Sequence, residues 1–148
     1  MKGKKGELKL RRAKRSDAPS IAELSGELGY PATTEDIRTR LAELKPARQH
    51  AVFLAEADEL VIGWIHVSLV PLLEVPRRAE INGLIVADGQ RGHGAGAKLL
   101  EAAERWARAK ECKGMSVRSN VIRDRAHVFY ERHGYQHFKT QKAFRKAL

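Results

Sequence analysis

The sequence has a single cysteine, Cys112, and no long apolar run. One cysteine cannot form an internal disulfide, so nothing indicates an oxidising compartment. No Cys/His spacing such as CxxC or HExxH occurs, and we therefore expect no metal site. The longest apolar runs, GLIVA and WIHVSLV, are far shorter than the ~18 to 20 residues of a membrane span, and the basic start lacks the apolar core of a signal peptide. We expect a cytoplasmic protein without a membrane partner.

The chain is rich in positive charge. Lys and Arg total 28 against 18 Asp and Glu, a formal net charge of +10, which favours acidic ligands through the summed field. The basic residues are spread along the chain and are not interleaved with aromatic residues, so the pattern disfavours a nucleic-acid platform. A length of 148 residues with 43% hydrophobic residues suits one globular domain, over residues 1–148.

The first half of the chain predicts a strand, two helices and three strands. Alternating apolar residues predict the first strand, β-branched and aromatic residues predict the strands at 50–57 and 60–70, and capping residues before an apolar stripe predict the helices. The helices are expected at 16–29 and 33–45, and the strands at 7–13, 50–57, 60–70 and 79–87. The strand at 79–87 is almost continuously apolar, as expected where both faces of a sheet are covered.

The second half begins with a helix that carries an apolar stripe. Leu99, Ala102, Ala103, Trp106 and Ala107 repeat at helical spacing, and Gly114 is expected to end this helix. A short strand at 115–119, a helix at 124–134 and terminal strand material at 135–140 and 144–148 follow. The order β-α-α-β-β-β-α-β-α-β, with a further terminal strand, predicts a mixed α/β sheet.

The stretch DGQRGHGAGAKLL, residues 88–100, places four glycines where a strand passes into a helix. Glycine costs conformational entropy on folding, so such a cluster indicates that a ligand must approach the backbone closely. The free N–H groups and positive dipole end of a helix start bind phosphate without any side chain.

Two well-known phosphate loops do not fit this stretch. Leu99 follows Lys98, so the hydroxyl that binds magnesium in a Walker loop is missing. Gly92, Gly94 and Ala97 match the loose GxGxxG/A of dinucleotide folds, but that motif belongs in an early βαβ unit with more strands to follow. A tight turn with close helix packing is the structural alternative.

Arg91, Gly94 and Gly96 read as RxxGxG between an apolar strand and a long helix. This resembles the pyrophosphate loop of the GNAT superfamily of acyl-CoA N-acyltransferases. The segment SNVIRDRAHVFYERHGY is similar to the family's second cofactor segment, with Asn120, Ala126, Phe129, Tyr130 and Gly134 at the family's spacings. The resemblance covers nearly the whole chain and implies a single-domain, mostly antiparallel central sheet flanked by helices.

The resemblance implies acetyl-CoA or coenzyme A as cosubstrate and no metal. The pyrophosphate would be bound by the backbone of Arg91, Gly92, His93, Gly94, Ala95 and Gly96, and the pantetheine arm would lie along the main chain of Leu84, Ile85 and Val86. Asn120, Ala126 and Phe129 would complete the cofactor site; Asn120 also has the alternative of capping the next helix.

Acyl transfer to an amine requires a neutral amine and a proton for the departing thiolate. By resemblance, Tyr130 is the general acid, with a core aromatic as its alternative. Glu80 heads the fourth strand, where many family members place a general base that acts directly or through water; its alternative is a solvent-exposed charge. His66, on a strand, is the histidine that most needs a structural check.

The resemblance implies transfer of an acetyl group to a primary amine of a small molecule, with an aminoglycoside (and hence antibiotic resistance) or an aminoalkyl compound as candidates. Acceptor recognition is expected from residues 27–40 and 69–78, where Arg77 and Arg78 favour an anionic acceptor. A protein N-terminal or lysine acetyltransferase, an acyl-CoA sensor without activity and a basic nucleic-acid-binding domain stay open as alternatives. A homodimer is a further expectation.

Overall fold

The computed structural model describes residues 7–27, 29–44, 48–90, 94–119 and 123–148. It divides into two compact units, Met1–Val117 and Arg118–Leu148, which are treated separately below. The expectation of one domain over the whole chain stays a prediction.

The first unit contains the sheet and three of the helices, in the predicted order. The two predicted N-terminal helices, the strands and the long helix after the glycines are all present. Their bounds are β1 (Lys9–Arg12), a short 3-10 turn (Arg15–Asp17), α1 (Ala18–Glu27), α2 (Thr34–Glu43), β2 (His50–Ala57), β3 (Leu60–Val70), β4 (Arg78–Val86), α3 (Ala95–Ala109) and β5 (Met115–Val117).

The five strands form one sheet in the order β1-β2-β3-β4-β5. All neighbours are antiparallel except β4 and β5, which are parallel and pair only from Ala79–Met115 to Ile81–Val117. The mixed, mostly antiparallel sheet is therefore confirmed. β4 is the strand that pairs antiparallel on one side, with β3, and parallel on the other, with β5.

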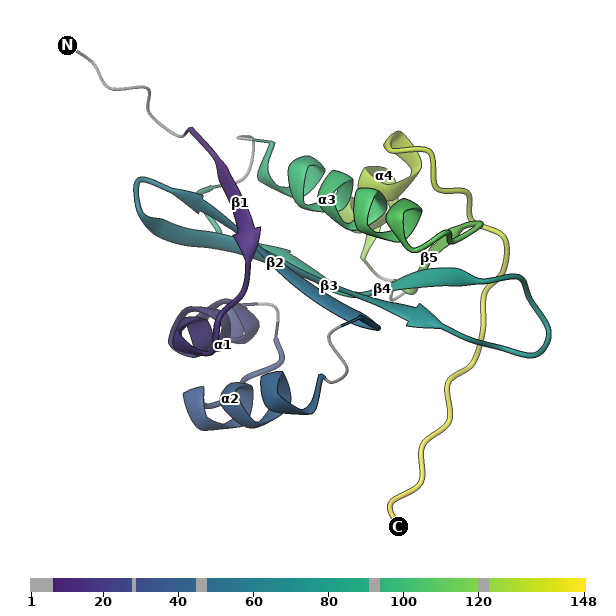
Figure 1. The fold of residues 1–148 in the computed structure, drawn as a ribbon, viewed down its shortest axis with the longest axis horizontal. Helices are drawn as coiled ribbons and strands as arrows, with labels where there is room; N and C mark the ends of the chain where they lie inside the picture. The colour runs from purple at the N-terminus through teal and green to yellow at the C-terminus, as the bar shows by residue number, and fades with distance from the viewer. Residues whose placement is uncertain (1–6, 28, 45–47, 91–93, 120–122) are drawn as a thin grey trace. The chain divides into compact units, whose positions relative to one another are not determined.

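Helices cover both faces of this sheet (Figure 1). α3 packs on one face against β2, β3 and β4, and its buried stripe includes Leu99, Leu100 and Ala103. α1 packs on the other face against β3 and β4, with α2 beside it. Ile21 of α1 and Ile37 of α2 are buried in a cluster with Leu54 of β2. We call these the α3 face and the α1 face of the sheet.

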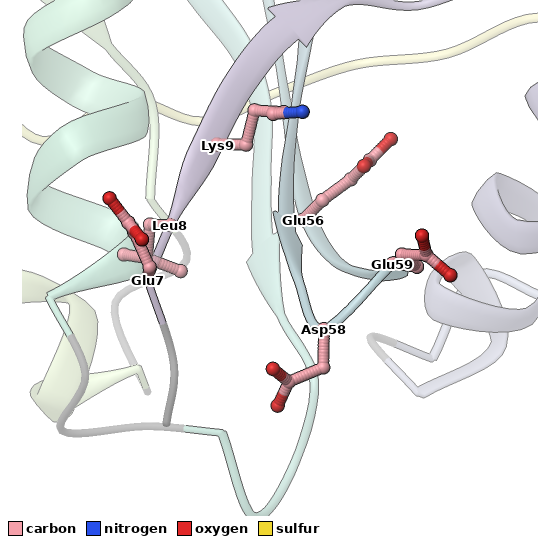
Figure 2. A pocket seen from close by; sticks show the side chains of 6 residues that line it. All are labelled: Glu7, Leu8, Lys9, Glu56, Asp58 and Glu59. Atoms are coloured by element: carbon pink, nitrogen blue, oxygen red, sulfur yellow. The ribbon is translucent and has the colours of Figure 1, made fainter. Parts of the chain in front are cut away.

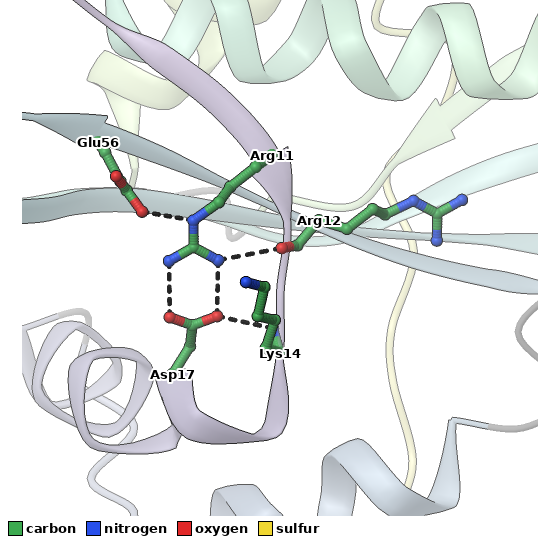
Figure 3. Close-up of polar contacts among 5 residues, drawn as sticks. All are labelled: Arg11, Arg12, Lys14, Asp17 and Glu56. Carbon is green, nitrogen blue, oxygen red and sulfur yellow. Dashed lines mark hydrogen bonds and ion pairs between the residues drawn. The ribbon is translucent and has the colours of Figure 1, made fainter. Parts of the chain in front are cut away.

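A charged network fixes the start of α1 to the edge of the sheet (Figure 3). The Arg11 guanidinium donates two hydrogen bonds of 2.8 Å to the Asp17 carboxylate and a third to Glu56. Asp17 also accepts from the backbone N–H of Lys14 at 2.6 Å and is only 8% exposed. The Arg11 cation lowers the pKa of the Asp17 carboxyl, so the pair stays ionised.

The second unit holds α4 (Asp124–Arg132), as predicted, but no terminal strand. Residues 135–148 have no regular secondary structure, so the strand material expected at 135–140 and 144–148 is not found as strand. Local residue types were the only signal for it, and a strand also needs a neighbour to take its backbone hydrogen bonds. No helix within the described ranges is long and apolar enough to cross a membrane.

Candidate functional site

β4 presents different chemistry on its two faces. Ala79 and Ile81 are 0% and 3% exposed and lie on the α3 face. Because side chains alternate along a strand, Arg78, Glu80 and Asn82 project from the α1 face. Glu80 is half-buried and Asn82 is exposed, although β4 is an interior strand. The sheet is therefore open above this part of β4, and three polar side chains lie at the opening.

A bulge in β4 lies at Asn82, the last residue of this polar triplet. Val67 pairs with Ile81 and His66 pairs with Gly83, so Asn82 is the extra residue without a pairing partner in the β3–β4 ladder. Gly83 is required here because a Cβ at this position would lie 2.7 Å from the Trp64 ring. Bulges re-aim side chains and end pairing next to active sites, and this one separates the polar end of β4 from its apolar end.

The apolar end of β4 has a free edge. The Ala87 N–H donates to the Ile62 carbonyl at 2.7 Å, which fixes the alternation of the β3–β4 ladder. By that alternation the N–H and C=O of Leu84 and Val86 point away from β3, whereas those of Ile85 point toward it. β5 pairs with β4 no further than Ile81, and within the described chain β3 is the only strand that pairs with residues 83–86.

The N-terminus of α3 follows this edge. Gly94 is the N-cap residue with φ +77°, a conformation that L-residues with a side chain rarely adopt, and it provides no side-chain cap. The first intrahelical donor is Lys98, to the Gly94 carbonyl at 3.0 Å, so the N–H groups of Ala95, Gly96 and Ala97 have no partner within the helix. With no acidic residue in this first turn, the positive dipole end is not compensated, as an anion site requires.

A polar row crosses the α1 face through Glu80. The sheet register places His50, Ser68, Glu80 and Ser116 opposite one another on β2, β3, β4 and β5. Ser68 is 7% exposed and accepts a 2.8 Å hydrogen bond from the Asn82 amide. Glu80 is thus placed among short polar side chains on the face that α1 only partly covers.

His66 lies beside this row. Its Nε2 is 3.1 Å from Nδ1 of His50, and burial, with a smaller contribution from the charge of His50, lowers the pKa of His66 to about 4. His66 is therefore neutral at physiological pH and adds no charge beside Glu80.

In the second unit, α4 carries Ala126, Phe129 and Tyr130, all half-buried. The Phe129 and Tyr130 rings meet edge to face with centroids 5.3 Å apart, and Tyr135 packs on Tyr130 at 5.7 Å. Burial raises the pKa of Tyr130 to about 12, which keeps its phenol protonated at neutral pH.

The predicted site residues fall into three groups. Glu80, Leu84, Ile85, Val86, Gly94, Ala95 and Gly96 follow one another along β4 and into α3 in the first unit; Ala126, Phe129 and Tyr130 lie together in the second. Arg91, Gly92, His93 and Asn120 lie outside the described residues. The roles assigned to all of them stay predictions, and the ladder geometry favours Leu84 and Val86 over Ile85 as main-chain partners of a ligand.

Sequence reasoning missed Ser68, Asn82 and Ser116. The available signal was the polar residue at every second position of RAEIN, which breaks the apolar pattern of a buried strand on one face only. Ser68 and Ser116 carried no comparable signal, because their places depend on the register of three strands.

A cavity lies elsewhere in the first unit. It has a volume of about 400 Å³ and is lined by Glu7, Leu8, Lys9, Glu56, Asp58 and Glu59, at the start of β1 and the β2–β3 turn (Figure 2). None of the predicted site residues lines it, and Glu56 is held by Arg11. Within the described ranges no group of three or more His, Cys, Asp or Glu side chains could hold a metal ion.

Comparison with known proteins identifies the family. The model of the acetyltransferase (GNAT) family matches residues 18–135. An aminoalkylphosphonate N-acetyltransferase of Salmonella typhimurium is 31% identical over 142 residues, which cover 90% of each chain. Aminoglycoside N(6')-acetyltransferase type 1 of Klebsiella aerogenes is 27% identical over 140 residues, which cover 90% of this chain and 92% of that one.

The fold agrees with this assignment. The structure of an aminoglycoside N-acetyltransferase in complex with CoA superposes with a TM-score of 0.87 over all of both chains, at 18% identity. The chain belongs to the acetyltransferase (GNAT) family and is an acetyl-CoA-dependent N-acetyltransferase.

Proposed function

We propose that this protein transfers the acetyl group of acetyl-CoA directly to a primary amine of a small molecule, bound on the α1 face of β4. The observation that carries the proposal is the run from the free edge of β4, at Leu84 and Val86, into the uncapped N-terminus of α3. Main-chain N–H and C=O groups there fit an amide-rich arm, and the helix start fits a pyrophosphate.

In this proposal the protein positions the two substrates and transfers the protons. Bound acetyl-CoA supplies the activated acetyl group. Leu84 and Val86 hold the arm through their main chain, and the N–H groups of Ala95, Gly96 and Ala97 donate to phosphate oxygens.

Glu80 accepts a proton from the acceptor amine, directly or through water, because only a neutral amine is a nucleophile. Tyr130 donates the phenolic proton to the departing thiolate. A pKa of about 12 keeps the Tyr130 phenol protonated across the physiological pH range.

The acceptor is a small amine, by likeness to relatives named for aminoglycosides and for aminoalkylphosphonates. Asn82 and Ser68 beside Glu80 provide the hydrogen-bonding groups that orient a polar acceptor.

A thermal-shift titration with acetyl-CoA, coenzyme A, NAD and ATP tests the cofactor site first. A ligand at ~100 times its Kd stabilises the folded state by ~2.7 kcal/mol, so the coenzyme A compounds alone should raise Tm. A folded protein that none of them stabilises would contradict the proposal.

A pair of glycine variants locates the site. Gly94→Asp places a carboxylate at the helix start, where it repels the phosphates, so cofactor affinity should fall at least tenfold. Gly89→Asp is the matched control, since Gly89 also has positive φ, at +83°, and the charge change is the same. Equal losses in both variants would place the pyrophosphate elsewhere.

Turnover is tested with a panel of primary amines and a free-thiol assay. Tyr130→Phe should lower kcat with little effect on KM for acetyl-CoA, whereas Tyr135→Phe should not. A Tyr130→Phe enzyme with unchanged kcat at pH 7 to 9 would remove Tyr130 from the mechanism.

The proposal includes a homodimer. Phe138, Phe144 and Leu148 are 71%, 92% and 114% exposed, and large apolar side chains in the open fit a surface that a partner chain covers. Light scattering should give twice the chain mass for the protein, and Phe138→Ser with Phe144→Ser should give a monomer. A monomeric unaltered protein would refute this part.

A further inference from the structure

Among the residues that the structure describes, three polar side-chain atoms on the α1 face are buried without a hydrogen-bond partner. They are Nε of Arg78, Oγ of Ser116 and Nε1 of Trp64. Buried polar groups in folded proteins are nearly always paired, so a cluster of unpaired ones needs a physical reason. Two of them lie at the opening above β4: Arg78 is on the same face as Glu80, two residues along the strand, and Ser116 is opposite Glu80 on β5.

Arg78 differs from its neighbour Arg77 in this respect. The Nε of Arg77 donates to the Lys110 carbonyl at 2.9 Å, at the end of α3, so that guanidinium has a structural role. Arg78 begins β4 and points to the α1 face, where the described residues offer its Nε no acceptor. Two adjacent arginines thus have separate tasks, and only Arg78 is available to a ligand at Glu80.

We propose that Arg78 binds an anionic group of the acceptor, so that the acceptor is a short zwitterion, a primary amine joined by a few bonds to a phosphonate, phosphate or carboxylate. The inference rests on the proposed function, because it assumes that the amine lies at Glu80. A guanidinium binds an oxyanion through two parallel hydrogen bonds, and the Ser116 hydroxyl can donate another to the same anion.

The spacing along β4 sets the size of this acceptor. Arg78 and Glu80 are two residues apart, about 7 Å between Cα atoms, which fits an amine and an anion separated by a short alkyl link. Val86 is eight residues after Arg78, about 26 Å along the strand, and the N-terminus of α3 comes after Val86 in the chain. The anion at Arg78 is therefore not the pyrophosphate that the α3 N-terminus would bind.

The same geometry disfavours a polycationic acceptor. Glu80 is the only acidic side chain of β4, and Arg78 stands beside it on the same face with a full positive charge. A second ammonium group of an aminoglycoside would meet that guanidinium in a partly buried setting, where like charges repel more strongly than in water.

Direct binding tests the inference without turnover. Calorimetry with aminoethylphosphonate, in the presence of coenzyme A, compares the unaltered protein with Arg78→Gln, Arg78→Lys and the matched control Arg77→Gln. Loss of hydrogen bonds to a charged group should weaken binding about 10- to 100-fold in Arg78→Gln, less in Arg78→Lys, and not in Arg77→Gln. Affinity for coenzyme A should be the same in all four proteins.

Turnover then separates the inference from the proposed function. The panel contains aminoethylphosphonate, aminopropylphosphonate, β-alanine, propylamine and an aminoglycoside. The inference expects kcat/KM to be at least tenfold higher for an anionic amine than for propylamine, and this preference should be lost in Arg78→Gln. Comparison of the phosphonates with β-alanine shows whether Arg78 prefers a phosphonate or a carboxylate. Acetylation of propylamine or the aminoglycoside with no anionic preference would overturn the inference alone. If no amine is acetylated by a protein that binds coenzyme A, the proposed function fails, and the calorimetry still decides whether Arg78 holds an anion.

Discussion

Gly83 and Trp64 give the most direct test of how β4 is built. A Cβ at Gly83 would lie 2.7 and 2.8 Å from two carbon atoms of the Trp64 ring, against the ~3.5 to 4.0 Å of a normal carbon contact. The ring would have to move by about 1 Å, but it packs against the cluster of Ala18, Ile21 and Leu54. Gly83→Ala should therefore cost about 1 to 3 kcal/mol, the range for overpacking, and lower Tm by about 3 to 10 °C.

A double-mutant cycle isolates the clash. Trp64→Phe removes the far ring of the indole, which holds the two clashing atoms, so Gly83→Ala should cost nothing in that background, or even stabilise by a few tenths of a kcal/mol through the unfolded state. Urea unfolding of the four proteins measures the coupling. If Gly83→Ala costs the same beside Trp64 and beside Phe, the steric reasoning is refuted.

Three further predictions concern stability. Arg11→Met leaves the Asp17 carboxylate buried without its cation and should cost about 2 to 3 kcal/mol in urea unfolding, with part regained in the double variant Arg11→Met/Asp17→Asn; no cost would mean that the pair is not formed. His66 has a folded pKa of about 4, below its unfolded value, so the folded state loses stability as the pH falls below about 6.5 and the unfolded chain takes up the proton. Between pH 7.5 and 5 the free energy of unfolding should fall by about 2 kcal/mol more in the unaltered protein than in His66→Gln, and parallel stability curves would contradict this. Gly94→Ala should cost about 1 kcal/mol because its φ is +77°, and an unchanged Tm would show that the helix start relaxes.

The fold could be predicted from the sequence wherever a local pattern decides the structure. The apolar stripe of Leu99, Ala103 and Trp106 predicted α3, and the β-branched and aromatic residues of 60–70 predicted β3. The segment 135–148 shows the limit: residue types alone indicated strands, but pairing requires a neighbour that local sequence does not reveal.

The candidate site was only partly predictable for the same reason. Glu80 and the glycines at the start of α3 carry motifs, whereas the polar row depends on which residues of β2, β3, β4 and β5 lie opposite one another. The different roles of Arg77 and Arg78 also needed the structure, because the carbonyl that accepts from Arg77 belongs to Lys110, 33 residues away.

The bulge at Asn82 allows the geometry of the site to be tested by deletion of one residue. Asn82 has no pairing partner in the β3–β4 ladder, so its deletion should leave a regular ladder in which Ile81 and Gly83 keep their partners Val67 and His66. The fold should survive, with far-ultraviolet circular dichroism unchanged.

Because Glu80 and Leu84 keep their partners Ser68 and Ile65, the deletion removes the local kink and extra twist of the bulge, which changes the direction of Glu80 relative to the main chain of Leu84. A misplacement of about 1 Å at the reacting amine is enough to cost about 100-fold, so kcat/KM should fall by that factor while coenzyme A still binds. Asn82→Ala is the control, because it removes the amide but keeps the bulge, and it should lose far less. Equal activity in the deletion variant and in Asn82→Ala would show that the bulge does not orient Glu80 relative to the cofactor strand.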